Sequence, residues 1–430
     1  MNTLRRLRRR PGMLALATLA ALICALPVLA GCAVHTGGDS IAYLDGGRLW
    51  VANGDGSQPR LIASAVAGYA WSPDHHELVY RAAAQVTAVP PGSTLGVPDL
   101  PGSINVASIN GGVPVQVSPN DGKLLSDAWW DAGGNRLVYR ESGLTGLQLD
   151  YVVSQADQLL GIARKVLLGD GSIPAITPDG KLVAVLDALG NLRIGAPGAV
   201  GGVIASGATA TLPGTGRPAH LLWRPGASEI LYPTVVAGGG VALMLTGLHG
   251  KSRPIASVPL LLDAAFSPDG ADLLLRTPTE FELWTVGAST PAFTWPESDP
   301  RALPWWSPDG HFILVHDAAG WQLADVAHHT MRSLLLHTTA APPSGPPPVA
   351  VDWRPAAGSP WSGDGTHAVF VGTAGDSWLG TPLPAGGEGG LYVSNFAHGT
   401  FGVATRITSG AHAAPSWSYL DPSTTYLLSA

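Results

Sequence analysis

Carboxylates recur at a fixed place in short Pro- and Gly-rich stretches of the sequence. Five of them stand two residues after a Ser or Thr: Asp74, Asp179, Asp269, Asp309 and Asp364. A ring of such groups could bind a metal ion or carry out acid–base chemistry. A short carboxylate in a tight turn, however, accepts hydrogen bonds from its own backbone. We therefore predict that these residues hold turns together, and we expect no metal ion and no cofactor.

Histidine pairs and one serine block are the other candidates for chemistry. Neighbouring strand residues point to opposite faces, so neither His75-His76 nor His328-His329 is expected to chelate one ion. Gly38-Asp39-Ser40-Ile41 resembles the serine block of GDSL hydrolases, and Asp325–His328 and Asp364–His367 could supply a base. That block requires a following helix in an α/β sheet, which this sequence does not predict. We therefore do not expect Ser40 to be a nucleophile.

Fourteen tryptophans could stack on a ligand, but six of them recur at the start of a repeated stretch, which predicts packing. Trp378 is the exception because it lies in a Gly-rich segment, Thr373–Gly390. Long irregular segments are where rigid scaffolds carry binding residues, and Val89–Ser103 is another. We predict that Trp378, Asp99 and Asp376 contribute to a binding surface formed by these loops.

The acidic turns belong to a ten-residue stretch that occurs eight times, with an apolar residue nine positions after its first residue. The anchors are 40 to 59 residues apart. The copies are WSPDHHELVY from Trp71, WDAGGNRLVY from Trp130, ITPDGKLVAV from Ile176, WRPGASEILY from Trp223, FSPDGADLLL from Phe266, WSPDGHFILV from Trp306, WSGDGTHAVF from Trp361 and WSYLDPSTTY from Trp417.

Each copy predicts a strand, a tight turn and a second strand, and two further strands follow before the next copy. A four-stranded unit of this length cannot bury its faces alone and stacks on its neighbours. We predict an all-β fold, a β-propeller of four-stranded blades, with eight blades favoured by the anchor count and seven as the alternative.

The two ends of the chain are expected to share the last blade and so remove a free sheet edge. The stretch 416–429 predicts two strands of that blade, and 48–52 and 60–64 predict the other two. Residues 41–44 also predict a strand, which gives this blade one strand too many. The sequence leaves open which strand pairs.

The N-terminus predicts a lipoprotein signal peptide over residues 1–31. Five arginines precede an apolar stretch from Met13 to Leu29, and Leu29-Ala30-Gly31-Cys32 resembles the lipobox of bacterial lipoproteins. The resemblance implies a lipid on Cys32. We expect a tether over 32–40 and the propeller domain over 41–430. The resemblance also implies a place in the cell envelope, on the outer face of the cytoplasmic membrane, or on the outer membrane of a diderm cell.

Composition limits the partners. Only 13% of the residues are charged and the net charge is −7, so we expect no nucleic acid. The only cysteines are Cys24, inside the predicted signal peptide, and Cys32, which leaves no thiol for a disulfide.

The repeats are similar to those of TolB-type, WD-like propellers, whose blades carry a P-x-W-S-P-D-G signature. The more distant LpqB lipoproteins also combine a lipobox with such a propeller. The resemblance is specific for the fold and not for the function. We expect a monomeric, membrane-anchored module that binds or scaffolds a protein or a cell-envelope polymer. The alternatives are a propeller enzyme that cleaves glycosides or lactones, and an accessory subunit of a signalling or secretion complex. Between enzyme and binding module we favour the binding module.

Overall fold

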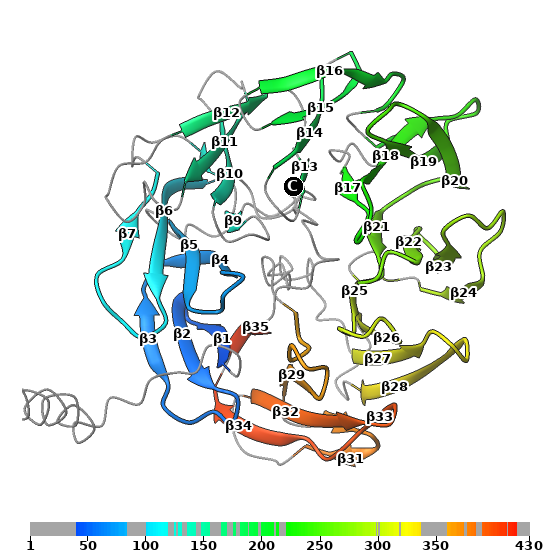
Figure 1. Ribbon diagram of the computed structural model, residues 1–430. Helices are drawn as coiled ribbons and strands as arrows, with labels where there is room; N and C mark the ends of the chain where they lie inside the picture. Colours follow the sequence, from blue (N-terminus) through cyan, green and yellow to red (C-terminus); the bar gives the residue numbers. More distant parts are fainter. Residues whose placement is uncertain are drawn as a thin grey trace, which may run out of the picture. The chain divides into compact units, whose positions relative to one another are not determined.

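The computed structural model describes residues 40–418 except 84–99, 119–123, 126–127, 131–135, 143–147, 155–164, 170–174, 178–180, 188, 197–198, 210–211, 215–220, 298, 300–301, 318–319, 337–358, 374–375, 384–388 and 411. Within this part of the chain, every helix or strand element is a β-strand, and neighbouring strands pair in antiparallel directions (Figure 1). In the description below, the strands of a blade are a, b, c and d in their hydrogen-bonding order, with the repeat anchor on strand a.

Three consecutive sheets follow this plan without additions. They are β13 (Ala175–Ile176), β14 (Val183–Leu186), β15 (Leu192–Ala196) and β16 (Ala199–Ala205); β17 (Leu222–Trp223), β18 (Glu229–Val235), β19 (Val241–Gly247) and β20 (Ser252–Val258); and β21 (Asp263–Phe266), β22 (Asp272–Arg276), β23 (Glu280–Thr285) and β24 (Phe293–Pro296). In each sheet the anchor residue ends the first strand, as the repeat predicts.

Two blades are joined into one sheet of nine strands. The first contains β4 (Val66–Trp71), β5 (Glu77–Ala83), β6 (Leu100–Ser108) and β7 (Val115–Gln116), and the second contains β9 (Trp129–Trp130), β10 (Arg136–Ser142), β11 (Gln148–Ser154) and β12 (Lys165–Gly169). Strand β8 (Leu124–Leu125) lies between them and pairs with β6 on one side and β10 on the other. The connection between the two blades is therefore itself part of the sheet.

The blade that comes after β24 in the chain is extended at its outer edge by strands from the blade that follows it. It contains β25 (Leu303–Trp306), β26 (Phe312–Asp317), β27 (Gly320–Asp325) and β28 (Thr330–Leu336), and β28 also pairs with β30 (Ser377–Trp378), which pairs with β31 (Thr381–Pro382). The following blade contains β29 (His367–Gly372), β32 (Gly390–Ala397), β33 (Thr400–Phe401) and β34 (Thr405–Ser409), and Trp361 joins it through a bridge to Ala368.

The last sheet is built from both ends of the chain, in the order β35 (His412–Trp417), β1 (Ser40–Asp45), β2 (Arg48–Asn53) and β3 (Arg60–Ala63). The open question of the extra strand is thus answered, because Ile41 of β1 pairs with Trp417. The prediction that 416–429 supplies two strands is wrong: β35 supplies strand a, and the N-terminal β1 supplies strand b. Residues 419–430 lie outside the described part.

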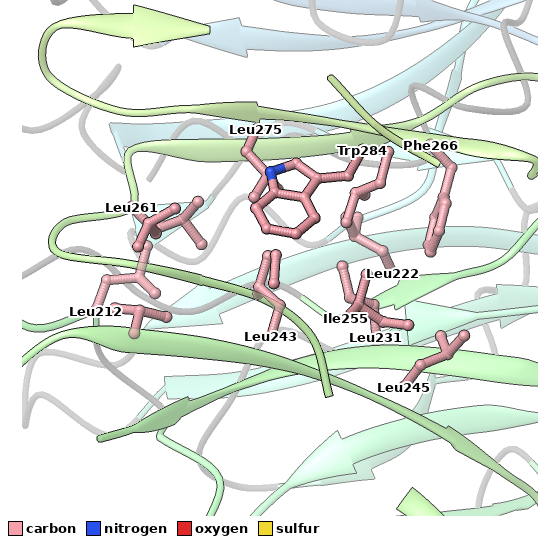
Figure 2. Close-up of a cluster of buried hydrophobic side chains, with 14 residues drawn as sticks. Leu212, Leu222, Leu231, Leu243, Leu245, Ile255, Leu261, Phe266, Leu275 and Trp284 are labelled. Atoms are coloured by element: carbon pink, nitrogen blue, oxygen red, sulfur yellow. The ribbon is translucent and has the colours of Figure 1, made fainter. Parts of the chain in front are cut away.

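Apolar clusters join successive sheets. One cluster lies between β1–β2 and β4–β6, and the next lies between β4–β6 and β9–β10. Four more lie between β13–β16 and β17–β19, between β17–β20 and β21–β23, between β21–β24 and β25–β28, and between β25–β28 and β29–β33. The last lies between β29–β32 and the sheet that contains β1, β2 and β35. Strands β12 and β14 also lie against each other. Figure 2 shows one cluster, in which Trp284 and Leu275 face Leu243 and Ile255. This succession of sheets is that of a β-propeller; the number of blades stays a prediction.

The six anchor tryptophans are all buried, as predicted. Three of their indoles also bind the preceding blade: Trp223 Nε1 donates to the Ala175 carbonyl at 2.9 Å, and Trp361 Nε1 donates to the Trp305 carbonyl at 3.3 Å. Trp71 Nε1 donates to Ser416 Oγ at 3.1 Å. Each acceptor belongs to the residue before the previous anchor, so the same contact that links internal blades also links the chain ends.

The Ser-Pro-Asp-Gly turns have the structural role predicted for their carboxylates. Ser307 Oγ accepts the Phe312 N–H at 2.9 Å and donates to Asp309 Oδ1 at 2.6 Å, and Asp309 Oδ1 accepts the His311 N–H at 3.0 Å. The turns at Ser72, Ser267 and Ser362 make the same three bonds. Asp179 lies outside the described residues.

Candidate functional site

Trp378 is not the exposed aromatic that we predicted. Its side chain is only 3% exposed, stacks on Phe370 with ring centroids 4.2 Å apart, and donates from Nε1 to the Gly402 carbonyl at 2.9 Å. The reason is the pairing of β30 with β28, which turns a Gly-rich loop into a strand covering the edge of the neighbouring blade. The prediction is therefore wrong, and Trp378 belongs to the hydrophobic core.

Asp376 is buried as well. Its Oδ2 accepts hydrogen bonds from the Thr373 N–H at 2.8 Å and the Thr373 hydroxyl at 3.0 Å, which fixes the entry into β30. A side chain in this position does not meet a partner at the surface. The other predicted residues, Asp99 and Cys32, lie outside the described part of the chain.

The b–c and d–a connections lie on one face of the propeller, which we call the loop face; the a–b and c–d connections form the opposite turn face. On the loop face, Leu189 and Val235 are exposed aliphatic residues, with 85% and 51% of their surfaces accessible. Leu189 lies in the b–c connection of one blade, and Val235 is the last residue of strand b, β18, in the neighbouring blade. No sequence pattern singles them out, because isolated exposed apolar residues are common.

Backbone contacts bring the two connections together. The Ala208 N–H donates to the Gly190 carbonyl at 3.0 Å, and Ala208 forms a β-bridge with Thr234. Leu189 and Val235 are thus each one residue away from a contact of Ala208. We call exposed Leu189 and Val235 the apolar loop-face patch, and Ala208 itself is buried.

Asp187 holds the Leu189 turn in place. Its Oδ1 accepts the N–H groups of Leu189 and Asn191, both at 3.0 Å, and its Oδ2 lies 3.1 Å from Arg193 Nε. The hydrogen bonds from Asn191 are the main cause that lowers the pKa of Asp187 to about 2. The apolar tip is therefore displayed on a turn with several polar restraints.

A buried polar cluster lies on the same face, two sheets further along the chain. Arg276 at the end of β22, Glu297 after β24 and Asp317 at the end of β26 are all buried. Arg276 Nη2 donates to the Asp299 carbonyl at 2.7 Å, and Glu297 Oε1 accepts the Asp299 N–H at 2.6 Å. The cluster therefore spans the connection between two blades.

The two carboxyl groups of this cluster interact directly. Burial is the main cause that raises the pKa of Glu297, and the hydrogen bond to Asp317 and the negative charge of Asp317 raise it further. Asp317 accepts the Gly320 N–H at 2.9 Å and a hydrogen bond from the Gln322 amide. A carboxyl pair of this kind can hold and exchange a proton, as catalytic pairs do, but structural networks also perturb pKa values.

A repeated basic residue in the sequence marks the position of Arg276 in this cluster. The position ten residues after the anchor is basic in four copies, Arg81, Arg140, Arg276 and His316. Arg81 is buried like Arg276, and its Nη1 donates to the Leu125 carbonyl at 2.9 Å. In both blades the arginine thus binds the backbone that leads to the next blade.

The other candidate chemistry of the sequence does not come together. Ser40 is fully buried at the start of β1, which agrees with the prediction that it is not a nucleophile. His328 Nδ1 lies 2.9 Å from Asp325 Oδ2 on an exposed turn. Among the residues that the structure describes, no group of three or more His, Cys, Asp or Glu side chains is placed to hold a metal ion. The described part also contains no helix that is long and apolar enough to span a membrane.

The chain was compared with known protein families, sequences and structures. No protein-family model matches the chain, and neither does any curated protein sequence. A structure titled as the eukaryotic initiation factor is 10% identical, with a TM-score of 0.49, and the alignment covers 88% of this chain and 98% of that one. The C-terminal WD40 domain of Sif2 is 12% identical, with a TM-score of 0.45 and coverage of 68% and 79%. The periplasmic gluconolactonase PpgL of Pseudomonas aeruginosa is 16% identical, with a TM-score of 0.42 and coverage of 69% and 94%.

Proposed function

We propose that this chain is a lipid-anchored, extracytoplasmic propeller that binds a partner protein through its loop face. The observation that carries the proposal is the apolar loop-face patch, in which exposed Leu189 and Val235 each lie one residue from a backbone contact of Ala208, and Asp187 restrains the Leu189 turn. Grouped exposed aliphatic residues on a rigid scaffold are typical of protein-binding surfaces. A cell-envelope polymer is the alternative partner.

The anchor is proposed from the N-terminal sequence. The arginines, the apolar stretch and Leu29-Ala30-Gly31-Cys32 occur in the order of a lipoprotein signal peptide. Cys32→Ser removes the thiol that would carry the lipid. We expect the wild-type protein to partition into the detergent phase and the variant into the aqueous phase, whereas partitioning of both with detergent would contradict lipidation.

Crosslinking tests the binding face. A photoreactive amino acid is placed at Leu189, and the matched control carries it at Val113, which is equally exposed but lies on the turn face. We expect a discrete protein adduct from position 189 and none from position 113. Once the partner is purified, Leu189→Glu with Val235→Glu should weaken binding by about tenfold or more, because charges oppose burial of the patch. An unchanged affinity would contradict the proposal.

A hydrolase is a second candidate, and the Glu297–Asp317 pair is the observation that favours it. Glycoside hydrolases work with two carboxyl groups, the acid of which has a raised pKa, and burial and Asp317 raise the pKa of Glu297. Purified protein would be tested with aryl glycosides and lactones. Hydrolysis that Glu297→Gln abolishes without lowering the melting temperature would support an enzyme, and hydrolysis that the variant retains would exclude this pair as the site.

A further inference from the structure

The N-terminal tether leaves the propeller at the turn face. In an internal blade, the Ser after the anchor donates its N–H to a carbonyl at the start of strand b. The Ser307 N–H, for example, donates to the Phe312 carbonyl at 2.8 Å. Ser418 donates in the same way to the Ser40 carbonyl at 2.8 Å, and the Ser40 N–H donates to Ser418 Oγ at 3.3 Å. Ser40 therefore lies where an a–b turn leads into strand b. No continuous chain forms this turn, because Ser40 and Ser418 are the first and the last of the described residues.

The chain before Ser40 is short. Residues 33–39 are all that separate Cys32 from Ser40. A fully extended chain spans at most about 3.3–3.6 Å per residue, so a lipid on Cys32 would lie within about 30 Å of Ser40. A longer tether would leave the orientation of the propeller free, whereas this one would keep a lipid on Cys32 close to Ser40, at the turn face.

The a–b turns of three successive blades lie close to one another, so this part of the turn face is continuous. A Cβ on Gly310 would lie 3.5 Å from Pro268 Cδ, and a Cβ on Gly365 would lie 3.5 Å from Pro308 Cδ. The turn face also carries exposed aliphatic side chains on its c–d turns, among them Val113 at 93% and Val403 at 83% accessible. Apolar tips of this kind can enter the headgroup region of a bilayer.

We infer that the turn face lies against the phospholipid bilayer and that the loop face, with its apolar patch, points away from it. This inference rests on the proposed lipid anchor at Cys32. It explains how a short tether is compatible with partner binding, because the patch and the tether are on opposite faces. A partner would then approach from the side away from the membrane.

Fluorescence quenching by lipid tests the orientation. The full-length lipidated protein is reconstituted in phosphatidylcholine vesicles, and Val113→Cys on the turn face is compared with Leu189→Cys on the loop face. Both positions carry exposed aliphatic residues, and Cys24 and Cys32 are the only native cysteines, so each label is specific in the processed protein. We expect lipids with nitroxide headgroups to quench the label at position 113 several-fold more than the label at 189.

A second pair, Val403→Cys and Val235→Cys, guards against a local effect of one substitution. The same difference between faces would support the inference, and equal or reversed quenching in both pairs would overturn it. Flotation of the vesicles and the mass of the N-terminal peptide are measured first. Protein that fails to float would contradict the lipid anchor itself, whereas floating protein with equal quenching would contradict only the orientation.

Discussion

Ser40 and Ser418 are 378 residues apart in the sequence, yet they complete one turn. The Ser418 N–H donates to the Ser40 carbonyl at 2.8 Å, and Ser418 Oγ accepts the Ser40 N–H at 3.3 Å. The same pair of bonds is made within each described Ser-Pro-Asp turn. The propeller is thus closed by repeating a local hydrogen-bond pattern between the two chain ends, together with the pairing of β1 and β35.

Deletion of strand β35 should open the ring of blades and destabilise the protein. Removing residues 412–430 deletes this strand, leaves β1 unpaired on one side and removes buried Trp417. We expect a loss of at least about 3–5 kcal/mol in unfolding free energy, or aggregation through the exposed edge. Thermal melting and size-exclusion chromatography measure both outcomes.

The matched control removes only residues 419–430, which keeps every described contact of Ser418. We expect its melting temperature to stay close to that of the full chain. A large loss in this control would show that the tail also supports closure, and no loss in the longer deletion would contradict the role of β35.

Trp378→Ala should destabilise the protein by about 3–5 kcal/mol, because it leaves a cavity beside Phe370 and removes a hydrogen bond to Gly402. The adjacent Leu379→Ala should cost less than about 1 kcal/mol, since Leu379 is exposed. Denaturant unfolding compares the two variants. Equal small losses would mean that Trp378 does not fill the core as the structure has it.

His75→Gly should stabilise the first Ser-Pro-Asp turn by about 1 kcal/mol. His75 has a φ of 63°, where glycine is favoured, and its equivalent in another blade is Gly270 with a φ of 70°. The reverse change, Gly270→Ala, should destabilise, because its Cβ would lie 2.5 Å from the Pro225 carbonyl oxygen. Melting temperatures that move in the same direction would contradict this reading of the turn.

Glu297→Gln should change how stability depends on pH. The pKa of Glu297 is raised by burial and by Asp317, so the folded state favours the protonated carboxyl. This contribution is present below the unfolded pKa, near 4.3, and is lost as the pH rises through the folded pKa. A neutral glutamine does not lose it, so we expect the variant to gain stability relative to the wild type as the pH rises.

Urea unfolding at several pH values between 2.5 and 8 measures this effect. Asp187→Asn is the control with the opposite sign, because the pKa of Asp187 is lowered to about 2 and its contribution is lost as the pH falls. A Glu297→Gln stability difference that does not vary with pH would contradict the carboxyl pair.

The sequence alone determined the repeating unit. Local physical chemistry sets it: Pro and Gly fix the turn, a Ser and an Asp bond its backbone, and an apolar residue at each side continues a strand. Because these effects act within ten residues, the turns at Asp74, Asp269, Asp309 and Asp364 and the buried anchors could be predicted.

Only the tertiary structure decided which strands meet and which side chains stay exposed. Trp378 is buried because its segment pairs with β28, which comes from another blade, and no local pattern encodes that pairing. Leu189 and Val235 come together through Ala208, and Glu297 meets Asp317, because separate blades stack. Likewise, strand b of the last blade is β1 and not the C-terminal segment, since hydrogen bonding between distant strands depends on the closed ring.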